Sequence, residues 1–274
     1  MATKTEKDYE RIAASKIYRP GDIDRMPKFL VYSRNKKGKS RFGSSAGVDN
    51  TIIADPEYGT SEMRQHNPHV WPILKWADMD DFVEWCRTDR KCPKCKPTHR
   101  FNWACLDGVT RISNMALRHV MKIAEDRSLD RIPGLVDPRR DYNKSGELLK
   151  EMLVRFHNMH DLGVIYTAQE RMDEPVDAEE DEDAGEVEAR FVADLPKGVR
   201  GHVNSLVDII GRLYVVKTND KEGNEVSQRR LWIGDSPKYD TGYRSDFVLP
   251  DYIRNPTVPK LVRLMREGTL RKTG

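Results

Sequence analysis

The feature that most constrains this chain of 274 residues is the stretch 28–45, where a short apolar strand runs into a basic loop. The strand covers Phe29 to Tyr32. The loop that follows, Ser33 to Ser40, matches the phosphate-binding pattern GxxxxGK(S/T), except that Ser33 stands at the first glycine. Such a loop curls backbone N–H groups around phosphate oxygens at a helix start, where unpaired donors and the helix dipole favour negative charge. The stretch predicts a nucleotide site at the end of a strand.

Residues of this loop have distinct expected roles. Gly38 allows a close backbone approach, Lys39 supplies a point charge for the β- and γ-phosphates, and the Ser40 hydroxyl can bind Mg²⁺. Ser33 must accept a turn that glycine adopts more easily. The predicted nucleotide-binding residues are Ser33, Arg34, Asn35, Lys36, Lys37, Gly38, Lys39, Ser40 and Arg41.

Length and charge narrow the class of protein. A chain of this size can form one domain with insertions or two small ones. It has no apolar run long enough for a membrane span and no signal-peptide core, which predicts a soluble cytoplasmic protein without a membrane partner. Residues 173–188 hold ten acids and no Lys or Arg, so the rest of the chain carries a net charge of +13. Such a basic remainder suits a polyanion.

Carboxylates follow two further strands. Thr51 to Ala54 is a β-branched run that ends in Asp55-Pro56-Glu57, and a strand end of this kind delivers acids to the ligand-binding edge of an α/β sheet. Glu57 is placed to orient or deprotonate a water that attacks the γ-phosphate. Alternatively, Asp55 is the functional acid, or both residues only cap a turn.

Two more strands are expected to end at the same edge. The run Phe101 to Thr110 contains Asp107, which is the expected second Mg²⁺-binding residue, acting through water. The run Leu162 to Arg171 contains Gln169, which could sense the γ-phosphate.

The cysteines cluster in a way that indicates a metal rather than disulfides. A CxxC turn with a proline, Cys92 to Cys95, is typical of a zinc knuckle, and Cys86 and His99 would complete four ligands. The alternative is a reduced loop without metal. Cys105 lies in an apolar strand and is expected in the core.

The remaining pattern alternates strand and helix, which predicts a mainly parallel sheet with helices on both faces and an antiparallel edge. The acidic segment is expected to be mobile, and residues 191–202 read as a basic loop that contacts DNA or serves as a solvated linker. Residues 1–27 form an arm against a neighbouring subunit or a frayed terminus. The expected elements are helices at 9–14, 115–124, 141–158, 203–210 and 258–266, a strand and helix within 73–88, and a hairpin at 211–217 and 229–233.

With these motifs in order, the chain resembles the RecA-like core ATPases encoded by phages, compact recombinases or single-strand-annealing ATPases related to Rad51. The resemblance covers roughly residues 27–255, between an N-terminal arm (1–26) and a C-terminal tail (256–274), and it implies a RecA-like P-loop α/β core. The cysteine-rich insertion, residues 86–99, and a mobile acidic loop, residues 172–190, depart from that core.

The resemblance also implies residue roles. Lys39 and Ser40 would bind ATP and Mg²⁺, with Asp107 supporting the ion. Glu57 would be the catalytic carboxylate and Gln169 the γ-phosphate sensor. The remaining implied residues are Lys238 and Arg244 as cations reaching into a neighbour's ATP site, and Arg139, Arg140, Lys197, Arg200 and His202 as DNA contacts.

The function expected from the resemblance is ATP-dependent DNA recombination by a homo-oligomeric ring or filament in the host cytoplasm. It would bind single-stranded DNA, work beside a single-strand-binding protein, and promote annealing or strand exchange. One alternative is a helicase-like or replication-associated NTPase ring of the same core. Another is a zinc-bearing DNA-binding or adaptor module whose loop no longer hydrolyses ATP.

Overall fold

The computed structural model describes residues 5–19, 24–128, 131–173, 189–220 and 222–268. The strands are β1 (Lys28–Ser33), β2 (Thr51–Asp55), β3 (His69–Pro72), β4 (Trp103–Asp107), β5 (Gly163–Asp173), β6 (Arg190–Ala193), β7 (Ile209–Asn219), β8 (Glu225–Trp232), β9 (Gly242–Tyr243) and β10 (Tyr252–Arg254). The helices are α1 (Glu6–Lys16), α2 (Lys39–Gly43), α3 (Trp76–Thr88), α4 (Val109–Arg127), α5 (Pro138–His157), α6 (Lys197–Leu206) and α7 (Val258–Glu267), with short 3₁₀ turns η2 (Ser44–Ala46) and η3 (Gly59–Met63).

One sheet runs through the molecule in the order β10-β8-β7-β1-β5-β4-β2-β3, with β6 beside β5 and β9 beside β7. The pairs from β3 to β7 along this order are parallel, and β8, β10, β6 and β9 are antiparallel to their neighbours. All six residues of β1 are buried, as expected for a central strand covered on both faces. The predicted fold class is confirmed as a mainly parallel α/β sheet flanked by helices, with an antiparallel C-terminal edge.

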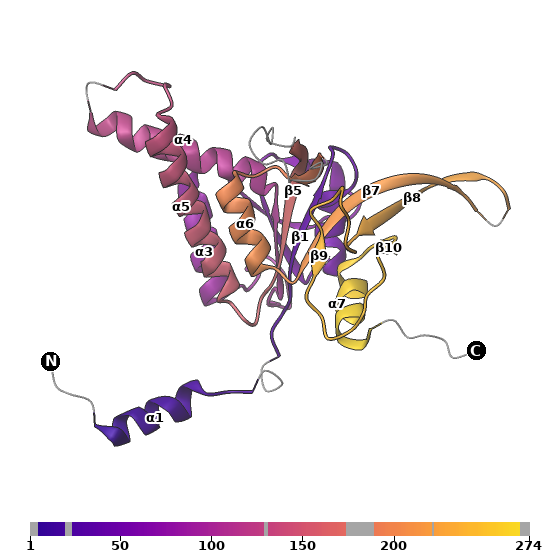
Figure 1. The fold of residues 1–274 in the computed structure, drawn as a ribbon, viewed down its shortest axis with the longest axis horizontal. Coiled ribbons are helices and arrows are strands. Elements are labelled where there is room, and N and C mark those ends of the chain that lie inside the picture. The colour runs from indigo at the N-terminus through magenta and orange to yellow at the C-terminus, as the bar shows by residue number, and fades with distance from the viewer. Residues whose placement is uncertain (1–4, 20–23, 129–130, 174–188, 221, 269–274) are drawn as a thin grey trace, which may run out of the picture.

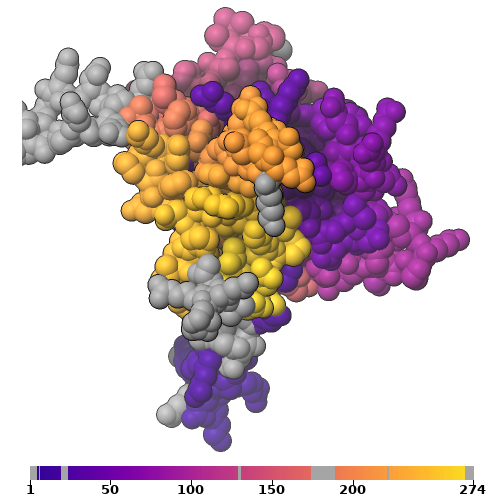
Figure 2. All heavy atoms as spheres, turned by 90° about the vertical axis from the view of Figure 1, so that its right-hand side faces the viewer, coloured from indigo at the N-terminus to yellow at the C-terminus, as the bar shows by residue number. Residues whose placement is uncertain are grey.

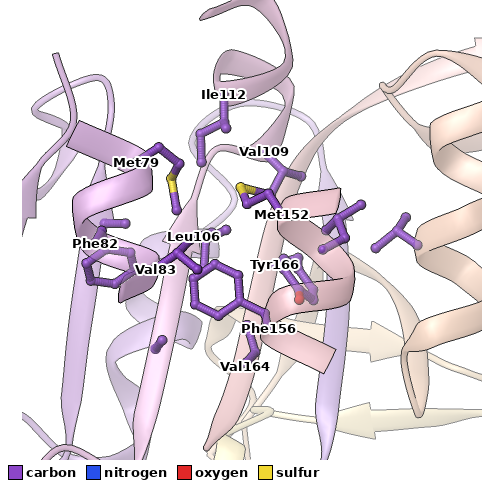
Figure 3. Packing of buried hydrophobic residues seen from close by; sticks show 14 of the residues in the cluster. Met79, Phe82, Val83, Leu106, Val109, Ile112, Met152, Phe156, Val164 and Tyr166 are labelled. Atoms are coloured by element: carbon purple, nitrogen blue, oxygen red, sulfur yellow. The ribbon is translucent and has the colours of Figure 1, made fainter. Parts of the chain in front are cut away.

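The helices cover the two faces of this sheet unequally. Helices α3, α4, α5 and α6 lie on one face (Figure 1), where they pack on Leu30 and Tyr32 of β1 and their neighbours. Figure 3 shows the centre of this cluster, with Phe82 and Phe156 facing Leu106 and Val164. On the other face α2 and α7 pack on the alternate residues of the same strands. The period of two along a strand therefore divides the core into two layers.

Two helices, α1 and α7, lie outside the predicted core of residues 27–255. Helix α7, which was expected within the tail, places Val258 and Leu261 in the second core layer. Helix α1 begins at a Thr5 capping box and lies apart from the sheet (Figure 1). The predicted acidic loop lies mostly outside the described residues. In the described part of the chain, no helix combines the length and the apolar character needed to cross a membrane.

The stretch 197–202 is helical, so its prediction as a loop is wrong. It forms most of α6, and the predicted helix 203–210 ends early because β7 begins at Ile209. The apolar side chains Val199 and Val203 are four residues apart and buried, which draws this stretch onto the sheet despite its two glycines. The expected strand near residue 73 is β3, which ends at Pro72.

We predict that Gly163→Ala destabilises the fold. A Cβ at this first residue of β5 would overlap the Trp103 indole, which is itself stacked on Phe29. We expect the free energy of unfolding to fall by about 1–3 kcal/mol, as for other overpacked cores. The matched control is Gly201→Ala on exposed α6, where a Cβ meets nothing within 4 Å. Urea unfolding of both variants measures the difference, and equal midpoints would refute this packing argument.

Candidate nucleotide site

The phosphate loop turns by two left-handed residues rather than at its first position. Ser33 is the last, buried residue of β1, and the positive φ angles fall at Lys36 (59°) and Gly38 (98°). The loop therefore needs no glycine at Ser33. Helix α2 after the loop has only five residues, so the N–H groups of the loop, more than a helix dipole, form the expected anion cradle.

The Lys39 ammonium lies at the mouth of this loop. Its Nζ donates to the backbone oxygens of Ser33 (3.1 Å) and Arg34 (3.2 Å) and lies 3.3 Å from Ser33 Oγ. Burial lowers the pKa of Lys39, while the charges of Asp107, Glu57 and a third acid, Glu170, oppose that shift. The lysine charge is thus set among the acids that the sequence predicts at this edge.

Asp107 and Ser40, the predicted magnesium ligands, lie in contact with each other. Asp107 ends β4, and its carboxylate accepts hydrogen bonds from Thr167 Oγ1 (2.8 Å) and from the Ser40 hydroxyl. Burial raises the pKa of Asp107, and these hydrogen bonds counteract the shift. Because a carboxylate and a hydroxyl are oxygen donors of the kind that Mg²⁺ prefers, these two residues fit the ion.

The two acids that follow β2 have different environments. Asp55 is buried and accepts hydrogen bonds from the N–H groups of Glu57, Gly59 and Thr60 and from the Thr60 hydroxyl. Asp55 therefore holds the turn, and its oxygens are occupied. Glu57 is exposed, acts electrostatically on Lys39 and lines a groove of about 630 Å³. Of the alternatives left open by the sequence, this arrangement favours Glu57 as the reacting carboxylate.

Gln169 ends up beside the phosphate loop, as its position on β5 predicts. It pairs with Ser33 across the β1–β5 ladder, and its N–H donates to Thr110 Oγ1 (3.1 Å). The next residue, Glu170, is buried between two cations. It lies 2.6 Å from Arg212 Nε of β7 and 3.3 Å from Arg34 Nε of the loop.

Arg229 of β8 also reaches the loop, although no sequence pattern indicates it. A Cβ added to Gly38 would lie 2.6 Å from Arg229 Nε, and this Nε is buried without a hydrogen-bond partner among the described residues. Figure 2 shows the hairpin of β7 and β8, in orange, adjoining indigo atoms of the early chain. The hairpin projects from the sheet on the side opposite α4 and α5 (Figure 1), and only its pairing with β1 brings Arg229 to the loop.

Lys238 and Arg244 lie outside this constellation. Lys238 is exposed and its carbonyl accepts from Phe191 N–H of β6. Arg244 directly follows β9, the strand that pairs with the first residues of β7. Its guanidinium donates to the Ser205 carbonyl (2.9 Å). Among the described residues, neither side chain hydrogen-bonds to the phosphate loop of its own chain.

The predicted DNA contacts divide into exposed and buried residues. Arg139 and Arg140 are exposed in the first turn of α5, whose start is fixed by Asp137 accepting from both of their N–H groups. Lys197 is exposed at the start of α6. Arg200, however, is 9% exposed and pairs with Asp173 at 2.5 Å, so its guanidinium is not available to a phosphate. His202 is half-buried on the same helix.

Helix α4 carries cations along two grooves. The groove beside Glu57 is lined by Tyr58, Lys75, Arg111, Arg118, His119 and Lys122, among others. A second groove of about 670 Å³ lies between α4 and α5 and includes Arg127, Arg140 and Lys144. The helix pair projects beyond the sheet (Figure 1). The second groove also includes Glu147 and Glu151, but cations outnumber acids along α4 and α5, so the pair forms a mildly basic arm.

Of the four predicted metal ligands, the structure brings three together and places the fourth elsewhere. Cys92, Cys95 and His99 come together, and the fourth member of the group is His69 of β3. Cys86 instead packs in the first core layer on the buried face of α3. Helix α3 continues to Thr88 and directs the Cys86 side chain inward.

The chain is similar to a known protein family and to several solved structures. A family model described as an AAA domain matches residues 25–245. No curated protein sequence matches the chain. Similar solved structures include flagellar accessory protein FlaH from Methanocaldococcus jannaschii, with 10% identity, 85% of each chain covered and a TM-score of 0.36.

Two further structures are similar at the same low identity. A KaiC-like protein from Pyrococcus horikoshii is 10% identical over 85% of this chain and 91% of that chain, with a TM-score of 0.39. The RadB recombinase is 13% identical over 77% of this chain and 81% of that chain, with a TM-score of 0.41. The family model spans the phosphate loop, the strand-end acids and Gln169. This chain therefore belongs to the AAA domain family.

Proposed function

We propose that this protein is an ATP-dependent DNA recombination protein that binds single-stranded DNA and promotes annealing or strand exchange. The observation that carries the ATPase part is the convergence of Lys39, Asp107 and Glu57 at one sheet edge around the phosphate loop. The recombination part rests on the resemblance in motif order and on the basic α4–α5 arm.

The site residues have separable roles in this proposal. Loop N–H groups and Lys39 bind the β- and γ-phosphates of ATP, and Glu57 holds the attacking water. Gln169 contacts the γ-phosphate from β5. Ser40 and Asp107 would hold Mg²⁺, which neutralises phosphate charge when bound. Because Lys39 is already held by Ser33 and Arg34, its charge is positioned before the nucleotide arrives.

We place ATP hydrolysis at interfaces between subunits of a homo-oligomer. Transition-state charge on the γ-phosphoryl group is commonly met by an added cation. Lys238 and Arg244 do not hydrogen-bond to their own phosphate loop within the described chain, so each would serve a neighbour's site. Arg229 lies against the loop of its own chain and would supply a cation from within the subunit.

Single-stranded DNA would follow the arm of α4 and α5. Its cations Arg139 and Arg140 are exposed, and Lys197 is exposed on neighbouring α6. Phosphate contacts of this kind give affinity without sequence preference. A single-strand-binding protein would be a partner on the same DNA.

We predict that Lys39→Ala removes ATP binding together with hydrolysis. The variant loses the ammonium for the β- and γ-phosphates, and steady-state turnover should fall by at least about 100-fold. A fluorescent ATP analogue measures binding, and phosphate release measures turnover. Lys217→Ala is the control, because Lys217 is an exposed lysine of the β7–β8 hairpin that pairs with Glu225 and has no predicted part in nucleotide binding. Unaltered turnover in Lys39→Ala would discard the site.

We predict that Glu57→Gln separates binding from hydrolysis. The amide keeps the size of the side chain but cannot orient or deprotonate water as a carboxylate does, so hydrolysis should fall by about 100- to 10,000-fold. ATP affinity should stay within a few-fold of wild type. Equal loss in Glu62→Gln, an exposed acid of the nearby turn η3, would show a general charge effect and count against a catalytic Glu57.

We predict that the double variant Arg139→Ala/Arg140→Ala weakens DNA binding because fewer phosphates are neutralised. The slope of log affinity against log salt should decrease by about 0.7 for each phosphate that no longer has a cation partner on a single strand. Anisotropy of a labelled oligothymidine across a salt series measures this slope. Arg263→Ala on exposed α7 should leave it unchanged. A slope for the double variant equal to that of the control would remove the arm from the DNA path.

Strand annealing and strand exchange assays, run beside an unwinding assay, test the remaining part of the proposal. Annealing or exchange that depends on ATP supports recombination. Unwinding without either activity would identify the helicase-like NTPase ring. DNA binding by a wild-type protein with no ATP turnover would identify the adaptor module instead.

A further inference from the structure

Four side chains outside the nucleotide site converge at the other end of the sheet. His69 begins β3, and Cys92, Cys95 and His99 belong to the hairpin-like segment between α3 and β4. One ligand atom from each residue lies within 4.8 Å of those from all the others. Nothing in the proposed ATPase chemistry uses these residues.

The two histidines are oriented as metal ligands. The Nδ1 of His69 lies 2.9 Å from the Val48 carbonyl, which can only accept a hydrogen bond, so the proton belongs on Nδ1. This leaves the lone pair of Nε2 directed at Cys95 Sγ, 3.1 Å away. A second group that fixes the tautomer of a ligating imidazole is a regular feature of zinc sites.

The Nε2 atom of His99 gives independent support. It is buried and has no hydrogen-bond partner among the described residues. Leaving such a nitrogen unsatisfied destabilises the fold, and a metal ion would remove that cost. Phe101 packs edge-on against both rings, with centroids 5.1 Å from His69 and 4.9 Å from His99. The rings are therefore held in place by packing.

Backbone contacts join the two ends of the segment that carries Cys92 and Cys95. Cys92 N–H donates to the His99 carbonyl (2.9 Å), and Lys91 and Arg100 form an antiparallel bridge. This places Cys92 and His99 across from each other at the neck of the segment, with Cys95 beyond them. Both ends of the neck are anchored, because Arg90 and Arg100 pair with Asp161 in the turn before β5.

We propose that His69, Cys92, Cys95 and His99 form a closed, structural Zn²⁺ site that fastens the edge strand β3 to the segment between α3 and β4. Two sulfurs and two imidazoles favour Zn²⁺ over the oxygen-seeking Mg²⁺ or Ca²⁺. Bonds of about 2.0–2.3 Å need only a small contraction of the present group. The two thiols lose their protons on binding.

The position of the site explains why its role is structural. His69 pairs with Ile52 near the start of β2, whereas the phosphate loop follows the end of parallel β1. The proposed zinc site thus lies where the parallel strands begin, and the nucleotide site lies where they end. Four protein ligands also leave no position for a substrate. The strand β3 has only four residues and, among the described strands, pairs with β2 alone. The ion would therefore supply a connection that the sheet does not.

Metal analysis of the purified full-length chain tests the ligand set. We expect about one zinc per chain in wild type, and His69→Ala and Cys95→Ser should each lower zinc affinity by at least about 10- to 100-fold. Cys86→Ala is the matched control and should retain the metal. Co²⁺ in place of Zn²⁺ should give the visible absorption of a tetrahedral thiolate site, and Cys95→Ser should abolish it.

A second measurement, on the wild-type chain, tests the proposal even if the variants fail to fold. A strong chelator should lower Tm, and added Zn²⁺ should restore it. A metal-free protein that binds neither Zn²⁺ nor Co²⁺, or a Cys92–Cys95 disulfide in the freshly purified chain, would overturn the proposal. So would zinc loss in Cys86→Ala with retention in His69→Ala.

Lys39→Ala separates this proposal from the proposed function. It should bind zinc as wild type does, because one site lies where the parallel strands begin and the other where they end. Loss of ATP turnover on removal of zinc, with Mg²⁺ kept in excess over the chelator and an unchanged Tm, would place the zinc at the nucleotide site and refute a structural role.

Discussion

The position of one half-buried ammonium group organises the chemistry of this protein. Lys39 donates to oxygens at the end of β1 and lies in the field of Asp107, Glu57 and Glu170, which come from the end of β4, the turn after β2 and the interior of β5. A cation at this depth is costly unless acids surround it. The parallel order of β1, β5, β4 and β2 brings those acids to the same edge. The charge of Lys39 is therefore balanced only when the strands pair in this order.

Local patterns made the centre of this arrangement predictable. The loop around Gly38 and Lys39, and the acids Glu57 and Asp107 at strand ends, are encoded within a few residues of the strands that carry them. The fold class followed from the alternation of strands and helices. Ser33 was read as a compromise because the pattern asks for glycine, yet the left-handed turn falls at Lys36 and Gly38.

Features that depend on distant contacts could not be read in this way. Arg229 reaches the loop only because β8 folds back beside β7, and β7 pairs with β1. His69 joins the cysteines through the pairing of β3 with β2, so a ligand 23 residues from Cys92 replaces the nearer Cys86. Arg200 was expected on a DNA-facing loop, but the apolar spacing of Val199 and Val203 made the stretch helical and turned Arg200 toward Asp173.

The pairing of Glu170 with Arg212 links the phosphate loop to the segment that carries Lys238. Glu170 is 2% exposed, and the guanidinium of Arg212 lies over the rings of Phe191 and Tyr239 at 4.9 and 4.5 Å. Removing one partner of such a buried pair leaves an uncompensated charge, which costs about 3–5 kcal/mol. Arg34 of the phosphate loop is exposed and makes a longer contact with Glu170, which connects the loop to the Glu170–Arg212 pair.

The same rings continue the contact toward Lys238. Phe191 N–H donates to the Lys238 carbonyl, and Tyr239 is the next residue. A shift of Arg34 when phosphate binds would therefore change the charge balance around Glu170. This change would alter the position of Arg212 and its packing on the rings of Phe191 and Tyr239. The cation proposed to act on a neighbouring subunit thus lies a few direct contacts from the loop that would bind phosphate in its own subunit.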